Sequence, residues 1–203
     1  MRTENIRNVF LTPDVALEYD AYYQTEIGKT VDRIEKKIVS AHLKNLPKTN
    51  WLELGCGTGH WTEFFSENRL QLTAVDSSEA MLKIARSKNL ENVKFLNADA
   101  TQLPFPDNHF SEIISITMLE FVDDLEKVLN EIIRVLKPGG TLVLGCLNAL
   151  SEPGKNKNND PVFKYARFFS TEEIKKMLAC FGNPRLSAGV YFSPENFQRL
   201  QKL

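Results

Sequence analysis

Apolar residues follow two alternating patterns along this chain. Short apolar runs, each of a length typical of a buried strand, are separated by segments in which apolar residues recur every three or four positions. The runs lie at residues 51–54, 72–75, 93–96, 113–116 and 141–146. Strands that alternate with helices predict right-handed crossover units and a mainly parallel sheet with both faces covered.

The two ends of the chain carry helix signals of their own. The Thr-Pro pair at residues 12–13 is typical of a helix start, and apolar residues then recur at roughly helical spacing as far as Leu43. Toward the other end, Ser170 and Glu173 have the spacing of a capping box, which predicts a last helix. A strand is then expected over residues 186–192.

Residues 151–160 (SEPGKNKNND) are polar and show no periodicity. Ser, Pro, Gly and Asn favour turns, so this segment predicts an irregular surface loop. It follows the fifth predicted strand and therefore emerges at the carboxyl edge of the sheet, where ligands bind in open α/β sheets. Two interpretations stay open: a tolerated insertion, or a lid over a substrate.

Three glycines at alternate positions, Gly55, Gly57 and Gly59, join the first apolar run to the helix after it. A glycine loop at this place lets a ligand approach the backbone and offers it free N–H groups at a helix N-terminus. Asp76 ends the second run, where nucleotide-binding units place the acid that holds a ribose. The sequence therefore predicts a site for a cofactor that contains a nucleoside.

The spacing of the loop distinguishes it from a dinucleotide site, which favours G-x-G-x-x-G. In that register, His60 occupies the position of the third glycine. Glu53, just before the loop, adds a negative charge that suits an ammonium group better than a pyrophosphate. These features favour a ligand other than NAD, and an NAD-linked oxidoreductase stays as an alternative.

Composition and charge narrow the partners. The 25 Lys and Arg residues nearly balance the 26 Asp and Glu residues and are scattered, which argues against nucleic acid. No apolar run has membrane-spanning length, and the first ten residues do not resemble a signal peptide. The three cysteines lack metal-ligand spacing. We therefore expect a cytoplasmic monomer or homodimer that acts on a small molecule and binds no metal.

Further segments follow the predicted strands in a fixed order. They are Asp76, residues 97–100 (NADA), residues 103–105 (LPF), residues 115–124 (SITMLEFVDD) and residues 136–140 (LKPGG). With the glycine loop, this ordered set resembles the class I S-adenosylmethionine-dependent methyltransferases. The similarity is to the small-molecule branch that includes quinone-biosynthesis enzymes (methyltransferase type 11), and it covers Trp51 to Leu144.

The resemblance implies a fold. It is a Rossmann-like, doubly wound α/β domain with a mostly parallel sheet of six to seven strands, helices on both faces and additional N-terminal helices. A single domain is expected over residues 1–203. Within it, residues 1–46 form a helical cap, residues 47–146 the cofactor-binding core, and residues 147–203 a loop, the last helix and an edge strand.

The resemblance also implies a role for each matching position. The glycine loop would line the methionine part of S-adenosylmethionine, and Glu53 would orient its ammonium group. The loop positions are Gly55, Cys56, Gly57 and Gly59, with Cys56 expected mainly to fill space. The other expected contacts are Asp76 to the ribose, Asp99 and Ala100 to the adenine edge, Ser77 and Met81 beside the adenine ring, Thr117 near the transferable methyl group, and Tyr19 and Tyr22 over the sulfonium.

No catalytic residue is identified by these matches. Methyl transfer from a sulfonium requires alignment of the acceptor and exclusion of water more than a dedicated acid or base. Glu120, after the fourth strand, is the best-placed candidate base, although an acid there can equally be solvated or cap the next helix. Few residues after position 192 are left for a terminal strand pair. A non-catalytic S-adenosylmethionine-binding partner or sensor is therefore the alternative to a methyltransferase that yields S-adenosylhomocysteine.

Overall fold

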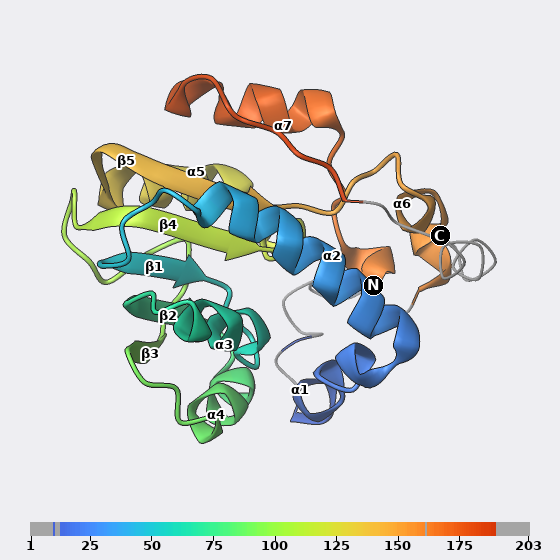
Figure 1. The fold of residues 1–203 in the computed structure, drawn as a ribbon. Coiled ribbons are helices and arrows are strands. Elements are labelled where there is room, and N and C mark those ends of the chain that lie inside the picture. The colour runs from blue at the N-terminus through green and yellow to red at the C-terminus, as the bar shows by residue number, and fades with distance from the viewer. Residues whose placement is uncertain (1–9, 11–12, 161, 190–203) are drawn as a thin grey trace, which may run out of the picture.

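The centre of the molecule is a parallel sheet of five strands (Figure 1). The computed structural model describes residues 10, 13–160 and 162–189. The strands are β1 (Trp51–Leu54), β2 (Leu72–Asp76), β3 (Val93–Asn97), β4 (Phe110–Ile116) and β5 (Leu136–Gly145). Their order is β3-β2-β1-β4-β5, and every neighbouring pair is parallel. The chain first adds β2 and β3 on one side of β1, and then crosses over to add β4 and β5 on the other side. The strand order therefore reverses between the neighbouring strands β1 and β4.

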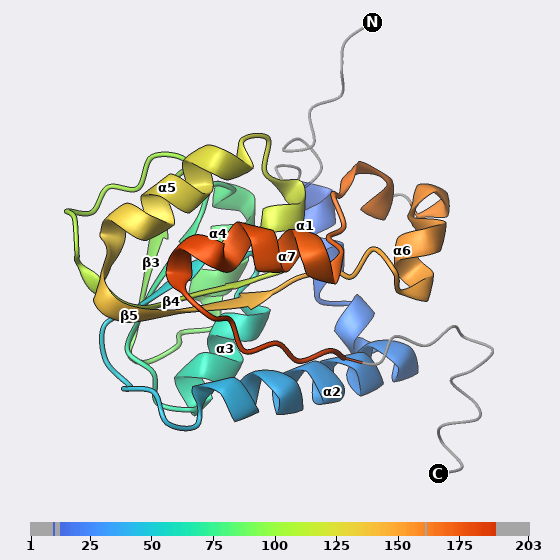
Figure 2. The ribbon, with the colours of Figure 1, turned by 90° about the horizontal axis from the view of Figure 1, so that it is seen from above.

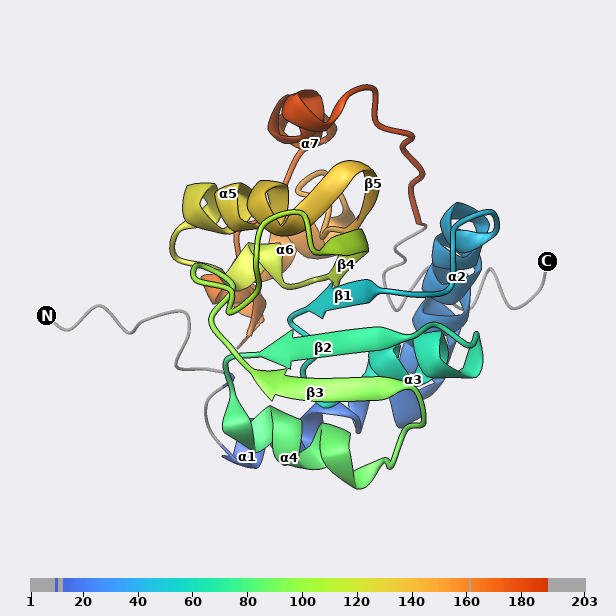
Figure 3. The ribbon, with the colours of Figure 1, turned by 90° about the vertical axis from the view of Figure 1, so that its left-hand side faces the viewer.

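Helices cover both faces of this sheet (Figures 2 and 3). They are α1 (Pro13–Tyr19), α2 (Glu26–Leu43), α3 (His60–Glu67), α4 (Glu79–Ser87), α5 (Leu125–Val135), α6 (Glu152–Asn156) and α7 (Thr171–Leu178). On one face, α5 packs Val128 and Ile132 against strand residues such as Leu52 and Ile113. On the other face, α2 and α3 pack against Trp51 and its neighbours.

The predicted N-terminal helical region is divided in two. A single 3₁₀ turn (Tyr22–Gln24) separates α1 from α2. Thr25 then caps α2, because its hydroxyl accepts a hydrogen bond of 2.9 Å from the Gly28 N–H. The capping box predicted for the last helix is confirmed at Ser170 and Glu173. None of the helices in the described part of the chain is long and apolar enough to cross a membrane.

Three expectations require correction. The described residues contain five strands, not six to seven; residues 186–189 do not pair as a strand, and residues 190–192 of that predicted strand lie outside the described residues. Strand β5 begins five residues earlier than predicted, because an irregular register pairs Leu136 with Phe110. The polar segment 151–160 forms α6 and a 3₁₀ turn, since Ser151 caps a new helix.

Two adjacent residues of α5 test the assignment of the core. Ile132 is fully buried, whereas Ile133 is 46% exposed. We expect Ile132→Ala to lower the free energy of unfolding by about 2–5 kcal/mol, because the lost methyl groups leave a cavity. Ile133→Ala should change it by less than about 1 kcal/mol. Urea denaturation of both variants measures the difference, and equal effects would contradict the packing of α5 described here.

Candidate active site

The predicted site residues meet at the carboxyl edge of the sheet, where the strand order reverses. The glycine loop follows β1, Asp76 ends β2, and Thr117 follows β4. Parallel α/β sheets bind ligands at this position because the loops on either side of the reversal diverge and leave a crevice. The topology therefore places these residues together although they are far apart in sequence.

The three loop glycines are required for different reasons. All have positive φ angles, of 71° at Gly55, 53° at Gly57 and 81° at Gly59. A Cβ atom on Gly55 would lie 2.2 Å from Cγ of Met118, and one on Gly59 would crowd Ala85. A Cβ atom on Gly57 would meet nothing within 4 Å. Gly57 is therefore the glycine whose backbone faces open space, where a ligand can approach.

Glu53 is buried at the carboxyl end of β1, with only 2% of its surface exposed. Its Oε2 atom has no hydrogen-bond partner among the described residues. Burial raises the pKa of Glu53 to about 8; the nearby Thr62 hydroxyl lowers it, and the charge of Asp76 raises it further. A buried carboxyl group with a free oxygen is a ready partner for a cationic group of a ligand.

Asp76 organises the loops around it. Its Oδ2 atom accepts a hydrogen bond of 2.8 Å from the Gly57 N–H, and its Oδ1 atom accepts one of 2.8 Å from the Ser78 N–H. Burial raises the pKa of Asp76, and these backbone N–H groups partly offset that effect. A carboxylate has about four acceptor positions, so these two bonds leave capacity for ribose hydroxyls.

The predicted adenine residues lie around the ends of β2 and β3. Asp99 accepts hydrogen bonds of 2.8 Å from both the N–H and the hydroxyl of Thr101, and Ala100 lies between these two residues. Ser77 is exposed, whereas Met81 is buried in the first turn of α4. Their assignment to the adenine ring stays a prediction.

Cys56 packs into the protein. Its side chain is 5% exposed and lies in a small apolar cluster with Ala74 and Leu82. Burial raises the pKa of its thiol well above the ordinary value, which makes it a poor nucleophile. These contacts agree with the space-filling role, and they leave only the Cys56 backbone for contact with a ligand.

The N-terminal helices are attached directly to the glycine loop. The buried hydroxyl of Thr58 donates a 2.5 Å hydrogen bond to Asp20, whose other oxygen pairs with Lys88 at 3.0 Å. His60 lies at the start of α3, with Nε2 2.6 Å from Asp32. Because these contacts join the cap to the loop, the cap and the cofactor crevice form one unit.

Tyrosines of the cap form an aromatic cluster. The rings of Tyr19 and Tyr23 meet edge to face with centroids 6.0 Å apart, and burial raises the pKa of Tyr19. Tyr22 lies beside Tyr23 but is 48% exposed, so it is a weaker candidate for closing the site. Thr117 has a φ angle of 51°, a conformation that is uncommon for a residue other than glycine.

Glu120 is neither solvated nor a helix cap, and these two expectations are wrong. Its side chain is 1% exposed, and its Oε1 atom accepts a hydrogen bond from the Leu147 N–H. The cap of α5 is Asp124, which accepts from the Lys127 N–H at 3.0 Å. Burial raises the pKa of Glu120 to about 7.

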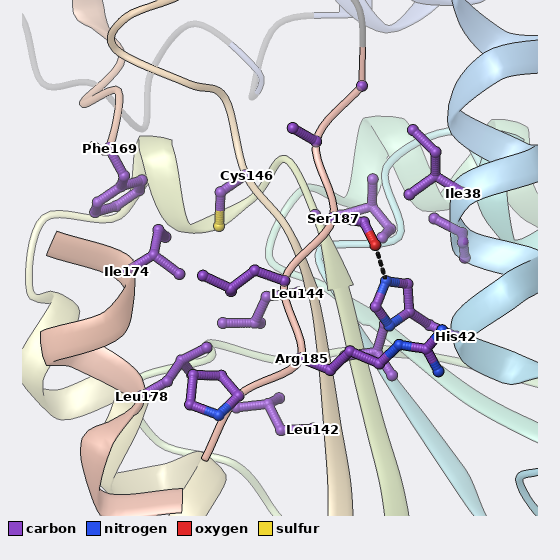
Figure 4. Close-up of a pocket in the computed structure, with 18 of the residues that line it drawn as sticks. Ile38, His42, Leu142, Leu144, Cys146, Phe169, Ile174, Leu178, Arg185 and Ser187 are labelled. Atoms are coloured by element: carbon purple, nitrogen blue, oxygen red, sulfur yellow. Dashed lines mark hydrogen bonds between the residues drawn. The ribbon is translucent and has the colours of Figure 1, made fainter. Parts of the chain in front are cut away.

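A groove of about 700 Å³ lies beside β5, between α2 and α7 (Figure 4). Thr117 is among the residues that line it. Its apolar wall includes Leu144 of β5 and Ile174 of α7. His42 of α2 lies across the groove and hydrogen-bonds Ser187 at 3.0 Å. A space of this size is large enough for a small molecule.

Several residues of the site have contacts that the sequence did not predict. Asn97, the first residue of the 97–100 motif, donates hydrogen bonds of 3.3 and 3.2 Å to the carbonyls of Asp76 and Ser77. Asp20 and Glu35 belong to the cap and approach the site only because the cap docks on the loop. No spacing rule predicts such docking from a single sequence.

Comparison with known proteins agrees with this geometry. A family model described as "Methyltransferase domain" matches residues 52–144. An uncharacterized protein of Methanocaldococcus jannaschii is 33% identical over 178 residues, which cover 85% of this chain and 80% of that protein. A solved structure from Thermotoga maritima, titled an S-adenosylmethionine-dependent methyltransferase and possible histamine N-methyltransferase, is 31% identical with a TM-score of 0.70. It covers 88% of this chain and 81% of that one.

The chain belongs to the S-adenosylmethionine-dependent methyltransferases. The demethylmenaquinone methyltransferase of Listeria welshimeri is also similar, with 37% identity over 124 residues that cover 58% of this chain. The match spans only 52% of the Listeria enzyme, about half its length. The family and the cofactor are therefore known for this methyltransferase, and its acceptor is a separate question.

The residues present fit S-adenosylmethionine. The cofactor carries an ammonium group, a ribose and an adenine ring. The crevice offers the free oxygen of Glu53, the open backbone at Gly57 and the carboxylate of Asp76. Among the described residues no cluster of three His, Cys, Asp or Glu side chains has the arrangement of a metal site.

A pair of glycines tests the role of the loop. Gly57 and Gly139 both have positive φ angles, and neither would place a Cβ atom within 4 Å of another atom. Valine should therefore strain the backbone similarly at both positions. We expect Gly57→Val to weaken S-adenosylhomocysteine binding by at least about 100-fold, or roughly 2.7 kcal/mol, because the side chain occupies the ligand's space. Gly139→Val should retain affinity; calorimetry showing equal affinity for both variants would contradict the assignment.

Proposed function

We propose that this methyltransferase acts on a small-molecule acceptor held between the N-terminal cap and the ends of β4 and β5. The observation that carries the proposal is the buried Glu53 carboxyl group, whose free Oε2 lies beside an open glycine loop. S-adenosylmethionine, when bound, supplies a methyl group on a positively charged sulfur that leaves as a neutral thioether. The protein then has to align the acceptor and exclude water.

Each residue of the crevice has a proposed task. Glu53 binds the ammonium group, Gly57 leaves room for the methionine chain, and Asp76 accepts hydrogen bonds from the ribose hydroxyls. Asp99 and Ala100 bind the adenine edge, with Ser77 and Met81 beside the ring. Tyr19 and Thr117 close the site around the sulfonium.

We propose a positioning role for Glu120 in place of the base suggested by its sequence position. Its carboxyl group accepts from Leu147, and its main-chain oxygen accepts from the Arg167 N–H at 2.7 Å. With 1% of its surface exposed, Glu120 is covered by the segments that it joins. Its hydrogen bonds hold the segments after β5 against the end of β4, next to the acceptor groove.

Transfer of a labelled methyl group tests the proposed function. The purified protein is incubated with S-adenosylmethionine labelled in its methyl group and with small amines, alcohols, phenols, quinols and thiols. We expect a labelled product together with an equal amount of S-adenosylhomocysteine. Tight cofactor binding with transfer to no acceptor class would contradict the proposal and favour the non-catalytic binding alternative.

The raised pKa of Glu53 gives a second prediction. At pH 6.5, a carboxyl group with a pKa of about 8 is protonated, and the α-amino group of the ligand is already an ammonium. The bound ammonium favours the ionised form of Glu53 and so lowers its pKa. Binding of S-adenosylhomocysteine should therefore release nearly one proton at this pH.

Calorimetry in buffers of different ionisation enthalpy measures this proton release. The observed binding enthalpy should vary with the buffer for the wild-type protein and vary much less for Glu53→Gln. An equal dependence in the two proteins would assign the proton to another group, and no dependence in the wild type would contradict the pairing of Glu53 with the ammonium.

A further inference from the structure

Two carboxylates hold neighbouring residues of the glycine loop. Asp76, at the end of β2, accepts a hydrogen bond of 2.8 Å from the Gly57 N–H. Asp20, in the cap between α1 and the 3₁₀ turn, accepts one of 2.5 Å from the hydroxyl of Thr58. Thr58 is fully buried, so water does not offer its hydroxyl an alternative partner. The loop is thus attached to the sheet through one residue and to the cap through the next.

Thr58 lies between two glycines whose φ angles are positive, 53° at Gly57 and 81° at Gly59. Glycine restricts the backbone less than any other residue, so the chain itself orients Thr58 only weakly. The hydrogen bond to Asp20 supplies a fixed orientation from outside the loop. It acts directly beside Gly57, whose backbone faces open space and is the proposed contact for the methionine part of the cofactor.

Asp20 is itself held by charges on two helices. Its Oδ2 atom lies 3.0 Å from Nζ of Lys88, which follows α4 as its C-terminal cap. The same Nζ atom lies 3.7 Å from Oε2 of Glu63 on α3. The Lys88 side chain is only 17% exposed, so solvent screens these interactions less than it screens surface pairs. Asp20 therefore presents its other oxygen to Thr58 from a fixed position, where α1 lies beside α4 (Figure 1).

A second contact joins the cap to the helix that continues the loop. Nε2 of His60, the first residue of α3, lies 2.6 Å from Oδ1 of Asp32 on α2. The His60 ring also stacks on Tyr23, with centroids 3.6 Å apart and planes 8° from parallel. The cap therefore docks at two positions that are two residues apart, Thr58 and His60, and α2 is part of this docked unit.

We propose that Asp20 is a positioning residue for the cofactor, because it holds the glycine loop in its binding conformation through the hydroxyl of Thr58. The inference rests on the proposed function, in which the glycine loop binds the cofactor. If the loop binds best while the cap is docked, bound cofactor stabilises the docked cap by the same free energy. Cap docking and cofactor binding are therefore coupled through a residue that lies outside the matched range 52–144.

Calorimetry with S-adenosylhomocysteine tests the positioning role. Asp20→Ala and Thr58→Val each remove one partner of the hydrogen bond and should weaken binding by about tenfold, because the lost bond joins a hydroxyl to a carboxylate. The double variant should bind within about threefold of either single variant, since both changes remove the same interaction. Losses that multiply in the double variant would overturn the proposal.

Two matched variants separate this hydrogen bond from other effects. Thr58→Ser keeps the hydroxyl and should bind within about threefold of the wild type. Glu18→Ala removes a carboxylate from an exposed position on α1 and should leave the affinity unchanged. Weak binding by Thr58→Ser would assign the effect to packing, and a loss in Glu18→Ala equal to that in Asp20→Ala would assign it to charge alone. Either result would overturn the role of Asp20.

Amide hydrogen exchange measures the coupling itself. S-adenosylhomocysteine should slow exchange in α2 of the wild-type protein, although no residue of α2 is proposed to contact the cofactor. In Thr58→Val saturated with the same ligand, exchange should still slow around Asp76, and the slowing in α2 should be largely lost.

The exchange experiment decides between the coupling and the proposed function. Unchanged exchange in α2 of the wild type, which requires no variant to fold, would overturn the coupling, and so would equal slowing of α2 in Thr58→Val. Either result would leave the proposed function intact. Failure of the wild-type protein to bind S-adenosylhomocysteine would overturn the proposed function itself, and with it this inference.

Discussion

The burial of two carboxyl groups at the ends of neighbouring strands is the constraint on which the site depends. Glu53 is the next-to-last residue of β1 and Asp76 is the last residue of β2, and burial raises the pKa of both. Backbone N–H groups of the adjoining loops satisfy Asp76, whereas Glu53 retains an oxygen without a partner. A polar group buried in this way is costly unless a ligand completes its interactions. We propose that the bound cofactor completes these interactions, with a cation at Glu53 and hydroxyl groups at Asp76.

The N-terminal cap connects this cofactor crevice to the acceptor groove. Asp20 binds the hydroxyl of Thr58 within the glycine loop, and the Ser78 hydroxyl donates to the carbonyl of Phe10 at 2.8 Å. The ring of Phe10 lies 4.8 Å from that of Phe121, beyond the end of β4. The cap thus spans the site from the adenine side to the acceptor side. Its helix α2 lines the groove with Ile38, Val39 and His42, and hydrogen bonds to the loop help to determine where the cap docks.

The sequence predicted the elements that depend on local pattern and on chain order. The apolar runs and the glycine spacing were sufficient for β1 to β5, for the helices between them and for the carboxyl-edge site, because burial on both sides and strand order leave few arrangements. The polar composition of residues 151–160 predicted an irregular loop, but Ser151 caps a helix there. The sequence also did not predict the burial of Glu120, because nothing near this residue in the sequence indicates that the segments after β5 cover it. Contacts between distant segments produce these features, and a single sequence does not encode them in its spacing.

The core and the segments outside it contribute to different parts of the site. The glycine loop, Glu53 and Asp76 belong to the sheet and its loops, within the residues that the family model matches, and we propose that they bind the cofactor. The groove beside β5 is lined in addition by residues of α2 and α7, which lie outside that match. Methyl transfer depends on how the acceptor is aligned with the methyl group. A change in α2 or α7 therefore alters the acceptor space without altering the residues proposed for the cofactor, so acceptor preference can differ between proteins that share the matched core.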